Sequence, residues 1–425
     1  MFIDTRPGTR PVLVIGAGPI GLAAAAELHL RGVEVTVLEA GHRAGSAVRS
    51  WGHVRLFSPW SQLMSPAAAE LLRRTDWIEP SPDDYPTGHE WATRYLDPLA
   101  ALMEPRVRYG HRVIGVAKRE RDLTVDGGRA DEPFVVTVQD SRTGSVDRHE
   151  ARAVIDASGT TGQPNPLGAE GYPAAGEVAL SGRLRYGTPD PITEKGRYAG
   201  RATVVVGAGT SALTSLIALT SIAAEHPDRR VVWALRRSEA GVRLGGHDAD
   251  ELPRRGALGA AVAKLVRDRA IEVVTSFRTV SVEPDGDRLR LVSADGAAVR
   301  GLDEVVVATG YRPDLSFLSE VRLDLDSRLQ APRALAPSID PNQHSCGSVA
   351  PHGFEVLQQG EPGLFLAGMK SYGRAASFLA MVGFEQVRSI AAAIDGDLAA
   401  AQAVALRLPD TGVCGGAGLF DPAPA

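Results

Sequence analysis

Two glycine-rich segments of the chain have the spacing of loops that bind the pyrophosphate of a dinucleotide. They read GAGPIG at residues 16–21 and GAGTSA at residues 207–212, and each follows a run of β-branched residues. Glycines let the backbone turn tightly and approach a pyrophosphate, and the helix that follows presents unpaired N–H groups and a positive dipole end. The sequence therefore predicts two bound dinucleotides, and a protein that holds two of them usually moves electrons between them.

The residues after the two loops predict different ribose partners. After the first loop, an alanine-rich helix leads to a strand over residues 33–39 that ends in Glu39, where a carboxylate can accept both hydroxyls of an adenosine ribose. After the second loop, the strand over residues 231–235 is followed by Arg236 and Arg237. A guanidinium pair suits a 2′-phosphate, so we expect NADPH rather than NADH there. A solvated loop is the alternative for the two arginines.

The closing strand of each unit is repeated as well. Apolar strands that end in small-residue turns occur at residues 153–159 (AVIDASG) and 304–310 (EVVVATG). A repeat of this length predicts an α/β fold with two Rossmann-like domains of related design. We expect one discontinuous domain over residues 1–185 and 304–425, with a second domain over residues 186–303 inserted into it.

Further elements are expected around these units. Thr87 and Glu90 have the spacing of a capping box and predict a helix start. Strand-like segments follow within residues 107–138. A last apolar strand and glycine turn, GLFLAGM at residues 363–369, are expected to lead into a helix over residues 375–394, and such a helix end can stabilise negative charge on a reduced ring.

The composition excludes several classes of protein. The 425 residues carry a net charge of −5 and no basic stripe that would neutralise nucleic-acid phosphates. No apolar run approaches the ~20 residues of a membrane span, and the glycines within residues 12–30 are spaced for a nucleotide loop rather than for a secretion signal. The two cysteines, Cys346 and Cys414, fit a reducing compartment. We therefore expect a cytoplasmic protein that binds neither nucleic acid nor a membrane and holds no metal.

Over residues 10–400, the chain resembles the two-dinucleotide-binding-domain flavoproteins. Three motifs carry the resemblance. Gly16, Gly18, Gly21 and Glu39 match the FAD fingerprint, and Gly207, Gly209 and Ala212 match the NADPH loop. Ala308, Thr309, Gly310 and Tyr311 match the ATG turn. The resemblance implies three layers in the order β/β/α in each Rossmann-like domain. Within this group the chain is similar to the class B flavin monooxygenases. Residues 51–60 and 368–374 look most like the arsenic-resistance-associated flavoproteins beside them.

The chain departs from the disulfide-reductase branch of this group. Those enzymes need a paired redox cysteine beside the flavin, yet no cysteine precedes Cys346. They also end their FAD strand in Gly-Asp, whereas Gly368 is followed here by Met369. A thiol-based mechanism therefore lacks its thiols.

The chain also departs from the monooxygenase branch. The FxGxxxHxxx(Y/F) signature is absent before the second loop, and Tyr186 stands where its histidine would be. The asparagine usual over the flavin is missing from residues 51–66, where Ser58 or Gln62 can supply a polar group.

The resemblance implies a monooxygenase that uses FAD, NADPH and O₂. NADPH reduces FAD, the reduced flavin takes up O₂ as a C4a-hydroperoxide, and the terminal oxygen passes to a nitrogen or sulfur of a small-molecule substrate. Ser58, Gln62 and Tyr372 are the expected catalytic residues. The residues expected to bind the cofactors are Gly16, Gly18, Pro19, Ile20, Gly21, Glu39, Ala40, Trp51, Val113, Ser158, Gly159, Gly207, Gly209, Thr210, Ser211, Ala212, Arg236, Arg237, Thr309, Gly310, Gly368 and Met369.

Two other functions stay open at this point. One is an NADPH-dependent flavin reductase or oxidase without oxygen transfer, and the other is a non-catalytic flavin-binding protein. A homodimer is implied only by the resemblance. The sequence does not identify the substrate.

Several other residues have a functional and a structural interpretation. Trp51, Phe57 and Trp60 either wall the flavin or substrate pocket or belong to the core. Lys370 and Arg374 either hold a cofactor phosphate or lie in a solvated loop.

The cysteines and two nearby histidines form a further candidate group. His344, Cys346 and His352 are a poor metal-ligand set because their spacing fits neither a strand nor a helix. Cys346 and Cys414 either form a redox pair or remain as two separate thiols.

Overall fold

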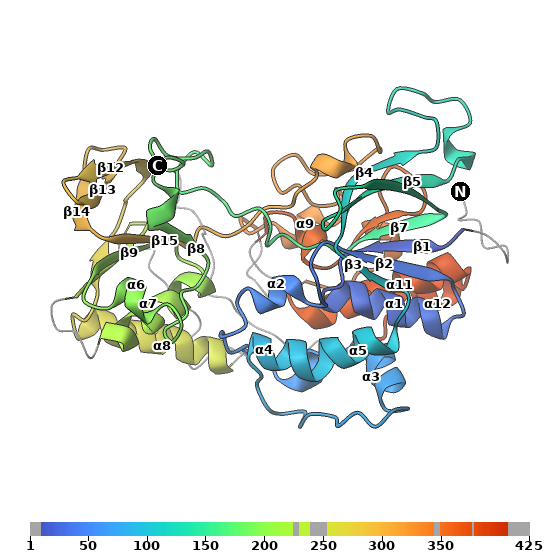
Figure 1. Cartoon of the computed structure of the whole chain (residues 1–425), viewed down its shortest axis with the longest axis horizontal. Coiled ribbons are helices and arrows are strands. Elements are labelled where there is room, and N and C mark those ends of the chain that lie inside the picture. Colours follow the sequence, from blue (N-terminus) through green and yellow to red (C-terminus); the bar gives the residue numbers. More distant parts are fainter. Residues whose placement is uncertain (1–9, 224–228, 239–252, 344–348, 376–377, 407–425) are drawn as a thin grey trace. The chain divides into compact units, whose positions relative to one another are not determined.

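Each glycine-rich loop follows the central strand of its own parallel sheet (Figure 1). The sheet around the first loop has the strand order β16-β7-β1-β2-β3, and the sheet around the second has the order β11-β10-β9-β15-β8. The protein is described by a computed structural model that covers residues 10–223, 229–238, 253–343, 349–375 and 378–406.

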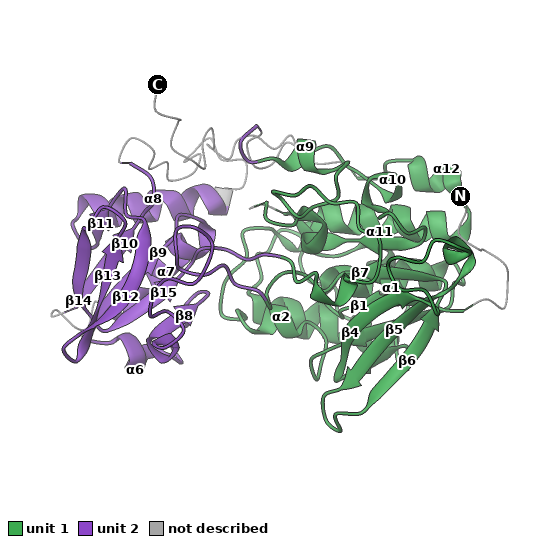
Figure 2. Ribbon diagram, turned by 90° about the horizontal axis from the view of Figure 1, so that it is seen from above, with its two compact units in different colours: residues 1–162, 313–340, 349–409 green, residues 163–312, 341–348, 410–425 purple. Residues whose placement is uncertain are grey.

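The two sheets belong to two compact units (Figure 2). Unit 1 contains residues 1–162, 313–340 and 349–409, and unit 2 contains residues 163–312, 341–348 and 410–425. Unit 2 extends beyond the expected residues 186–303 because β8 (Leu184–Tyr186) and β15 (Glu304–Val307) both join its sheet.

Alternating side chains on the strands of unit 1 produce its layers. Val12 and Val14 pack with the helices on one face of the parallel sheet, whereas Leu13 and Ile15 pack with an antiparallel sheet on the other face. The parallel sheet contains β1 (Val12–Ile15), β2 (Val35–Glu39), β3 (Val107–Tyr109), β7 (Ala153–Asp156) and β16 (Leu364–Leu366). The antiparallel sheet contains β4 (His111–Lys118), β5 (Phe134–Asp140) and β6 (Val146–Ala151). This is the expected β/β/α order.

The helices of unit 1 are mostly short, and α1 packs against α3 and α11. The helices are α1 (Pro19–Leu30), α2 (Ser46–Arg49), α3 (Pro66–Leu72), α4 (Gly88–Trp91), α5 (Asp97–Leu102), α9 (Ala336–Ile339), α10 (Phe354–Leu357), α11 (Ala380–Asp395) and α12 (Leu398–Gln402). The capping box is confirmed, since Glu90 N donates to Thr87 Oγ1 at 3.1 Å and Thr87 N to Glu90 Oε2 at 2.7 Å.

The expected start of the last long helix is wrong. Helix α11 begins at Ala380 instead of residue 375. Gly373 has φ of 57° and Arg374 N donates to Leu329 O at 2.7 Å. These two features hold the chain outside helical geometry after the glycine turn.

Unit 2 repeats the same layers. Val205 and Trp233 pack with the helices, whereas Val204 and Val232 pack with a second antiparallel sheet. Its other elements are β9 (Ala202–Val206), β10 (Arg230–Ala234), β11 (Glu272–Val274), the antiparallel β12 (Thr279–Asp285), β13 (Arg288–Ser293) and β14 (Ala298–Leu302), and α6 (Lys195–Tyr198), α7 (Thr210–Ala223) and α8 (Pro253–Arg267). In the described part of the chain, no helix is both long and apolar enough to cross a membrane.

Candidate functional site

The first glycine loop leaves open space above the start of α1. Gly16 has φ of 97°, and a Cβ on it would lie 3.0 Å from Ala157 O. A Cβ on Gly21 would lie 1.9 Å from Gly16 O, whereas a Cβ on Gly18 would meet nothing within 4 Å. No side chain caps α1, so its first N–H groups and its dipole face this open space. The loop therefore fits a pyrophosphate.

Glu39 is held at the tip of β2 by the same loop. Its side chain is buried, and its two oxygens accept hydrogen bonds from Ala17 N and Gly41 N, each at 2.7 Å. A carboxylate has about four lone-pair positions, so both oxygens keep the capacity to accept a hydroxyl. This fixed orientation fits the expected ribose contact, and Ala40 follows directly in the chain.

The second glycine loop repeats this geometry in unit 2. Gly207 has φ of 137°, and a Cβ on it would lie 2.2 Å from Ala308 O, while Gly209 has open space. Ala212 is fully buried in place of a third glycine, and Trp233 Nε1 donates to Gly207 O at 2.8 Å. Thr210 and Ser211, the first residues of α7, are exposed.

The arginine pair lies at the same edge of the sheet as this loop. Strands β9 and β10 are parallel, so Gly207 and Arg236 follow neighbouring strand ends. Arg236 is exposed, and Ser276 N donates to the carbonyl of Arg237 at 2.7 Å. A 2′-phosphate contact by these two arginines stays a prediction.

An asparagine holds the turn behind the second loop. Asn165 Nδ2 donates to Thr309 O at 3.1 Å, and Thr309 Oγ1 donates to Asn165 O at 2.7 Å. Gly310 accepts a bond from Asn165 N at 2.9 Å. The sequence does not indicate this role, because Asn165 is far from the turn along the chain.

Lys370 lies in neither of the two expected environments. Its side chain is fully buried, and its ammonium ion-pairs with Asp156 at 3.1 Å and donates to Ser158 Oγ at 3.0 Å and Asp314 O at 2.5 Å. Lys370 is thus not in a solvated loop, and internal groups surround its charge. Arg374 is exposed.

A hydrogen-bonded chain fixes the 3₁₀ turn η8 (Gly368–Tyr372), which contains Met369. Gln386 Oε1 accepts from Gly368 N at 2.7 Å, and Gln386 Nε2 donates to Ser371 Oγ at 2.9 Å and to His352 Nε2 at 2.8 Å. The imidazole therefore accepts at Nε2 and carries its proton on Nδ1, 3.1 Å from Ala350 O. Burial lowers the pKa of His352, which agrees with a neutral ring.

The three expected catalytic residues are all in unit 1. Ser58 is buried, and the Oε1 atom of Gln62 is buried without a hydrogen-bond partner in the described structure. Tyr372 is 2% exposed and contacts the rings of His352 and Phe378 at centroid distances of 5.8 and 5.0 Å. No hydrogen bond joins Tyr372 to Ser58 or Gln62 among the described residues.

The aromatic residues of the first unit mostly belong to its core. Trp60 is 1% exposed in the core cluster around α1, which favours the structural interpretation. Trp51 is half-buried and packs against Gly88. Val113 is a core residue of β4.

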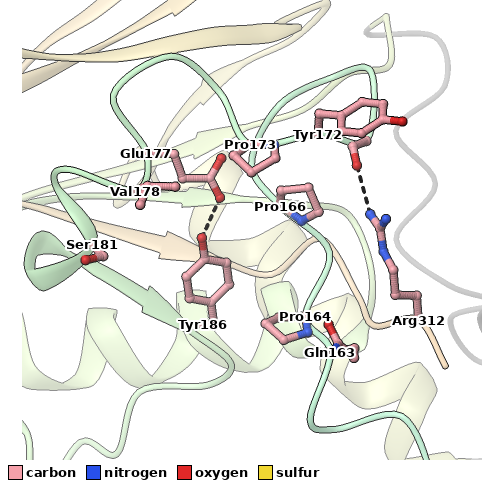
Figure 3. A pocket seen from close by; sticks show the side chains of 11 residues that line it. Gln163, Pro164, Pro166, Tyr172, Pro173, Glu177, Val178, Ser181, Tyr186 and Arg312 are labelled. Carbon is pink, nitrogen blue, oxygen red and sulfur yellow. Dashed lines mark hydrogen bonds between the residues drawn. The ribbon is translucent and has the colours of Figure 1, made fainter. Parts of the chain in front are cut away.

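Unit 2 contains a cavity of about 370 Å³ beside Tyr186 (Figure 3). The hydroxyl of Tyr186 donates to Glu177, a buried carboxylate that also accepts from Leu167 N at 2.9 Å and Ala174 N at 2.7 Å. Burial and this carboxylate raise the pKa of Tyr186. Tyr186 therefore acts as a neutral donor, and it cannot supply the titratable imidazole that the signature has at this position. The cavity is lined by three prolines as well, Pro164, Pro166 and Pro173.

Some of the expected groups fall outside the described residues. These are His344, Cys346 and Cys414, so neither the redox pair nor the three-residue metal set is tested. In the described part of the chain, no three His, Cys, Asp or Glu side chains gather as a metal site would require.

The fold and both loops define a flavin-dependent pyridine nucleotide oxidoreductase with FAD and NADP(H) as cofactors. A sequence profile described as pyridine nucleotide-disulphide oxidoreductase matches residues 13–334, and the chain belongs to this family. The resemblance to two-dinucleotide flavoproteins is confirmed.

Relatives in this family include reductases and oxygenases. The chain is 26% identical to ferredoxin–NADP reductase 1 of Cupriavidus necator over 319 residues, 75% of each chain. Its fold is similar to bacillithiol disulfide reductase Bdr (YpdA) from Bacillus cereus, with a TM-score of 0.65 and 22% identity over 91% of this chain and 99% of that one. DfoA, the desferrioxamine biosynthetic pathway cadaverine monooxygenase from Erwinia amylovora, gives a TM-score of 0.63 and 13% identity over 98% and 99%.

Two glycines of the first loop should respond differently to alanine. Gly21→Ala places a Cβ 1.9 Å from a backbone oxygen, so we expect it to lower the free energy of unfolding by roughly 2–4 kcal/mol. Gly18→Ala meets open space, so it should fold normally but bind FAD about tenfold more weakly or worse, because its Cβ occupies the space for the pyrophosphate. Thermal unfolding and FAD titration of the apoprotein test both, and wild-type affinity in Gly18→Ala would place the pyrophosphate elsewhere.

His352 should make the protein less stable as the pH falls. Its pKa is lowered in the folded state, so below about pH 6.5 the unfolded state binds a proton that the folded state does not. The contribution is complete above that pH and is lost as the pH falls toward the folded pKa. His352→Gln keeps an acceptor for Gln386 and removes the titration, so its melting temperature should fall less than that of the wild type between pH 7.5 and 5.5. If the melting temperatures of His352→Gln and the wild type fell equally with pH, this assignment would be contradicted.

Proposed function

We propose that the protein is an NADPH-dependent flavin monooxygenase that transfers one oxygen atom of O₂ to a nitrogen or sulfur of a small molecule. The observation that carries the proposal is the buried turn η8. Lys370 and Ser371 are fully buried and Tyr372 is 2% exposed, so this turn is a packed element that keeps water out beside the first phosphate loop. Oxygen transfer needs water to be excluded, because water and stray protons divert the reactive oxygen species to H₂O₂.

FAD, when bound, accepts a hydride from NADPH and activates O₂ in its reduced form. We assign the FAD contacts to Gly16, Gly18 and Gly21 at the pyrophosphate and to Glu39 at the ribose. The other expected contacts are Pro19, Ile20, Ala40, Trp51, Val113, Ser158, Gly159, Gly368 and Met369. Open space at Gly18 and the uncapped start of α1 support this assignment.

The proposed catalytic residues orient and shield the reacting atoms. Gln62 brings an unpartnered amide oxygen and Ser58 a buried hydroxyl, and each can bond a polar edge of the flavin. Burial raises the pKa of Tyr372, so its phenol stays protonated. Tyr372 therefore excludes water and can donate a hydrogen bond, but it does not act as a base.

The NADPH contacts are proposed at the second loop. Gly207, Gly209 and Ala212 shape it, and the exposed Thr210 and Ser211 start α7. Arg236 and Arg237 are the proposed contacts to the 2′-phosphate. Thr309 and Gly310 form the turn behind the loop.

A second candidate is an NADPH-dependent reductase that passes electrons to another acceptor. The similarity to the ferredoxin–NADP reductase of C. necator over 75% of the chain favours it. A dithiol mechanism is disfavoured for both candidates, because no cysteine precedes Cys346.

Anaerobic mixing followed by exposure to O₂ distinguishes the two candidates. We expect NADPH to bleach the yellow flavin band without oxygen, and O₂ then to produce a long-lived, blue-shifted flavin band. Immediate return of the oxidised spectrum with stoichiometric H₂O₂ would favour the reductase. A flavin band that persists under NADPH would contradict both enzymes.

Charge reversal tests the arginine pair. Arg236→Glu with Arg237→Glu should raise the KM for NADPH by roughly tenfold or more and leave the KM for NADH nearly unchanged, because only NADPH carries the 2′-phosphate. Arg300→Glu, an exposed position on β14, is the matched control. An unchanged preference for NADPH over NADH would remove Arg236 and Arg237 from the phosphate site.

A further inference from the structure

We propose that Lys370 is a positioning residue for FAD, whose buried ammonium holds together the two turns that support the phosphate loop. The inference rests on the FAD assignment and not on oxygen transfer, so it stands for a monooxygenase or a reductase.

One ammonium ties three segments of unit 1 that are distant in sequence. Lys370 comes from η8, Asp156 and Ser158 from the end of β7, and Asp314 from the point where the chain re-enters unit 1. The ammonium also lies over the ring of Phe317, 4.8 Å from its centroid. Strands β7 and β16 are parallel neighbours, so the two turns that Lys370 joins emerge at the same edge of the sheet.

Both turns pack directly against the phosphate loop and the first turn of α1. A Cβ on Gly16 would lie 3.0 Å from both Ala157 O and Ser158 Cα, which shows how closely the loop approaches the first turn. A Cβ on Gly368 would lie 2.9 Å from Ile20 Cγ1, a side chain in the first turn of α1. The turns thus support the loop from two sides, and a shift of either one would change the space at Gly18.

The ion pair makes separation of the two turns costly. The side chains of Lys370 and Asp156 are both 0% exposed, and a buried charge that loses its partner is strongly destabilising. Ser158 strengthens the link, because its Oγ donates to Asp156 Oδ1 at 2.6 Å while accepting from Lys370.

The fold itself does not require this charge. In unit 2 the turn behind Gly207 is held by the neutral side chain of Asn165 through Thr309. Because a neutral link serves behind the loop of unit 2, the buried ion pair behind the loop of unit 1 indicates a demand of that site, namely a rigid loop that binds FAD in one position.

The test compares two buried ion pairs of the same unit. Lys370→Met removes the proposed residue. Arg129→Met is the control, and it breaks the ion pair between Arg129 and Glu361. The two side chains of this pair are 2.6 Å apart and each is 3% exposed. Arg129 also donates hydrogen bonds to the carbonyls of residues 121, 122 and 320. FAD is removed from the whole 425-residue chain. Three quantities are then measured: the dissociation constant for added FAD, the visible circular dichroism of the bound flavin and the unfolding midpoint of the apoprotein.

We expect both variants to lower the unfolding midpoint of the apoprotein, but only Lys370→Met to weaken FAD binding, by roughly 30-fold or more, and to change the flavin spectrum. Lys370→Gln keeps a donor for Ser158 and Asp314 and should recover part of the affinity and of the spectrum. Equal FAD affinities in Lys370→Met and Arg129→Met would overturn the proposal. So would wild-type affinity and spectrum in Lys370→Gln, which also serves as the test if the methionine variant fails to fold.

Discussion

A close backbone approach sets the geometry of both dinucleotide sites. The first glycine of each loop lies against the alanine that follows a neighbouring strand, Gly16 against Ala157 and Gly207 against Ala308. A Cβ would be crowded at Gly16 and would collide with the backbone at Gly207, and both glycines have positive φ. This approach lets the chain leave the strand and enter the helix within a few residues, so the helix N–H groups end up facing an open space. The ribose residue, the backing turn and the following helix all depend on this placement.

Local signals in the sequence were sufficient for much of the fold. The β-branched run before the first glycine loop predicted a strand, and Thr87 with Glu90 predicted a helix start; the structure confirms both. Such signals act over a few residues, where backbone geometry and side-chain spacing are directly coupled. The start of α11 was misplaced because Gly373 keeps a turn open where composition alone favours a helix.

Contacts between residues distant in the chain could not be predicted from the sequence. Lys370 and Ser158 are 212 positions apart, and nothing near Lys370 in the chain indicates a buried partner. Tyr186 could be recognised as a departure from a signature, but its bond to Glu177 and the cavity beside it depend on how the loop after β7 folds back. Only the tertiary structure shows that a tyrosine can occupy this position as a fixed, neutral donor.

The two ends of the main segment of unit 2, residues 163–312, lie side by side. Arg312 N donates to Gln163 O at 2.9 Å, and the neighbouring Pro164 and Tyr311 form an isolated antiparallel bridge. A segment whose entry and exit are hydrogen-bonded to each other can be inserted into a host without pulling the host's flanking strands apart. Gene fusion or deletion at this junction is thus a simple route by which such a segment could be gained, exchanged or engineered within its host.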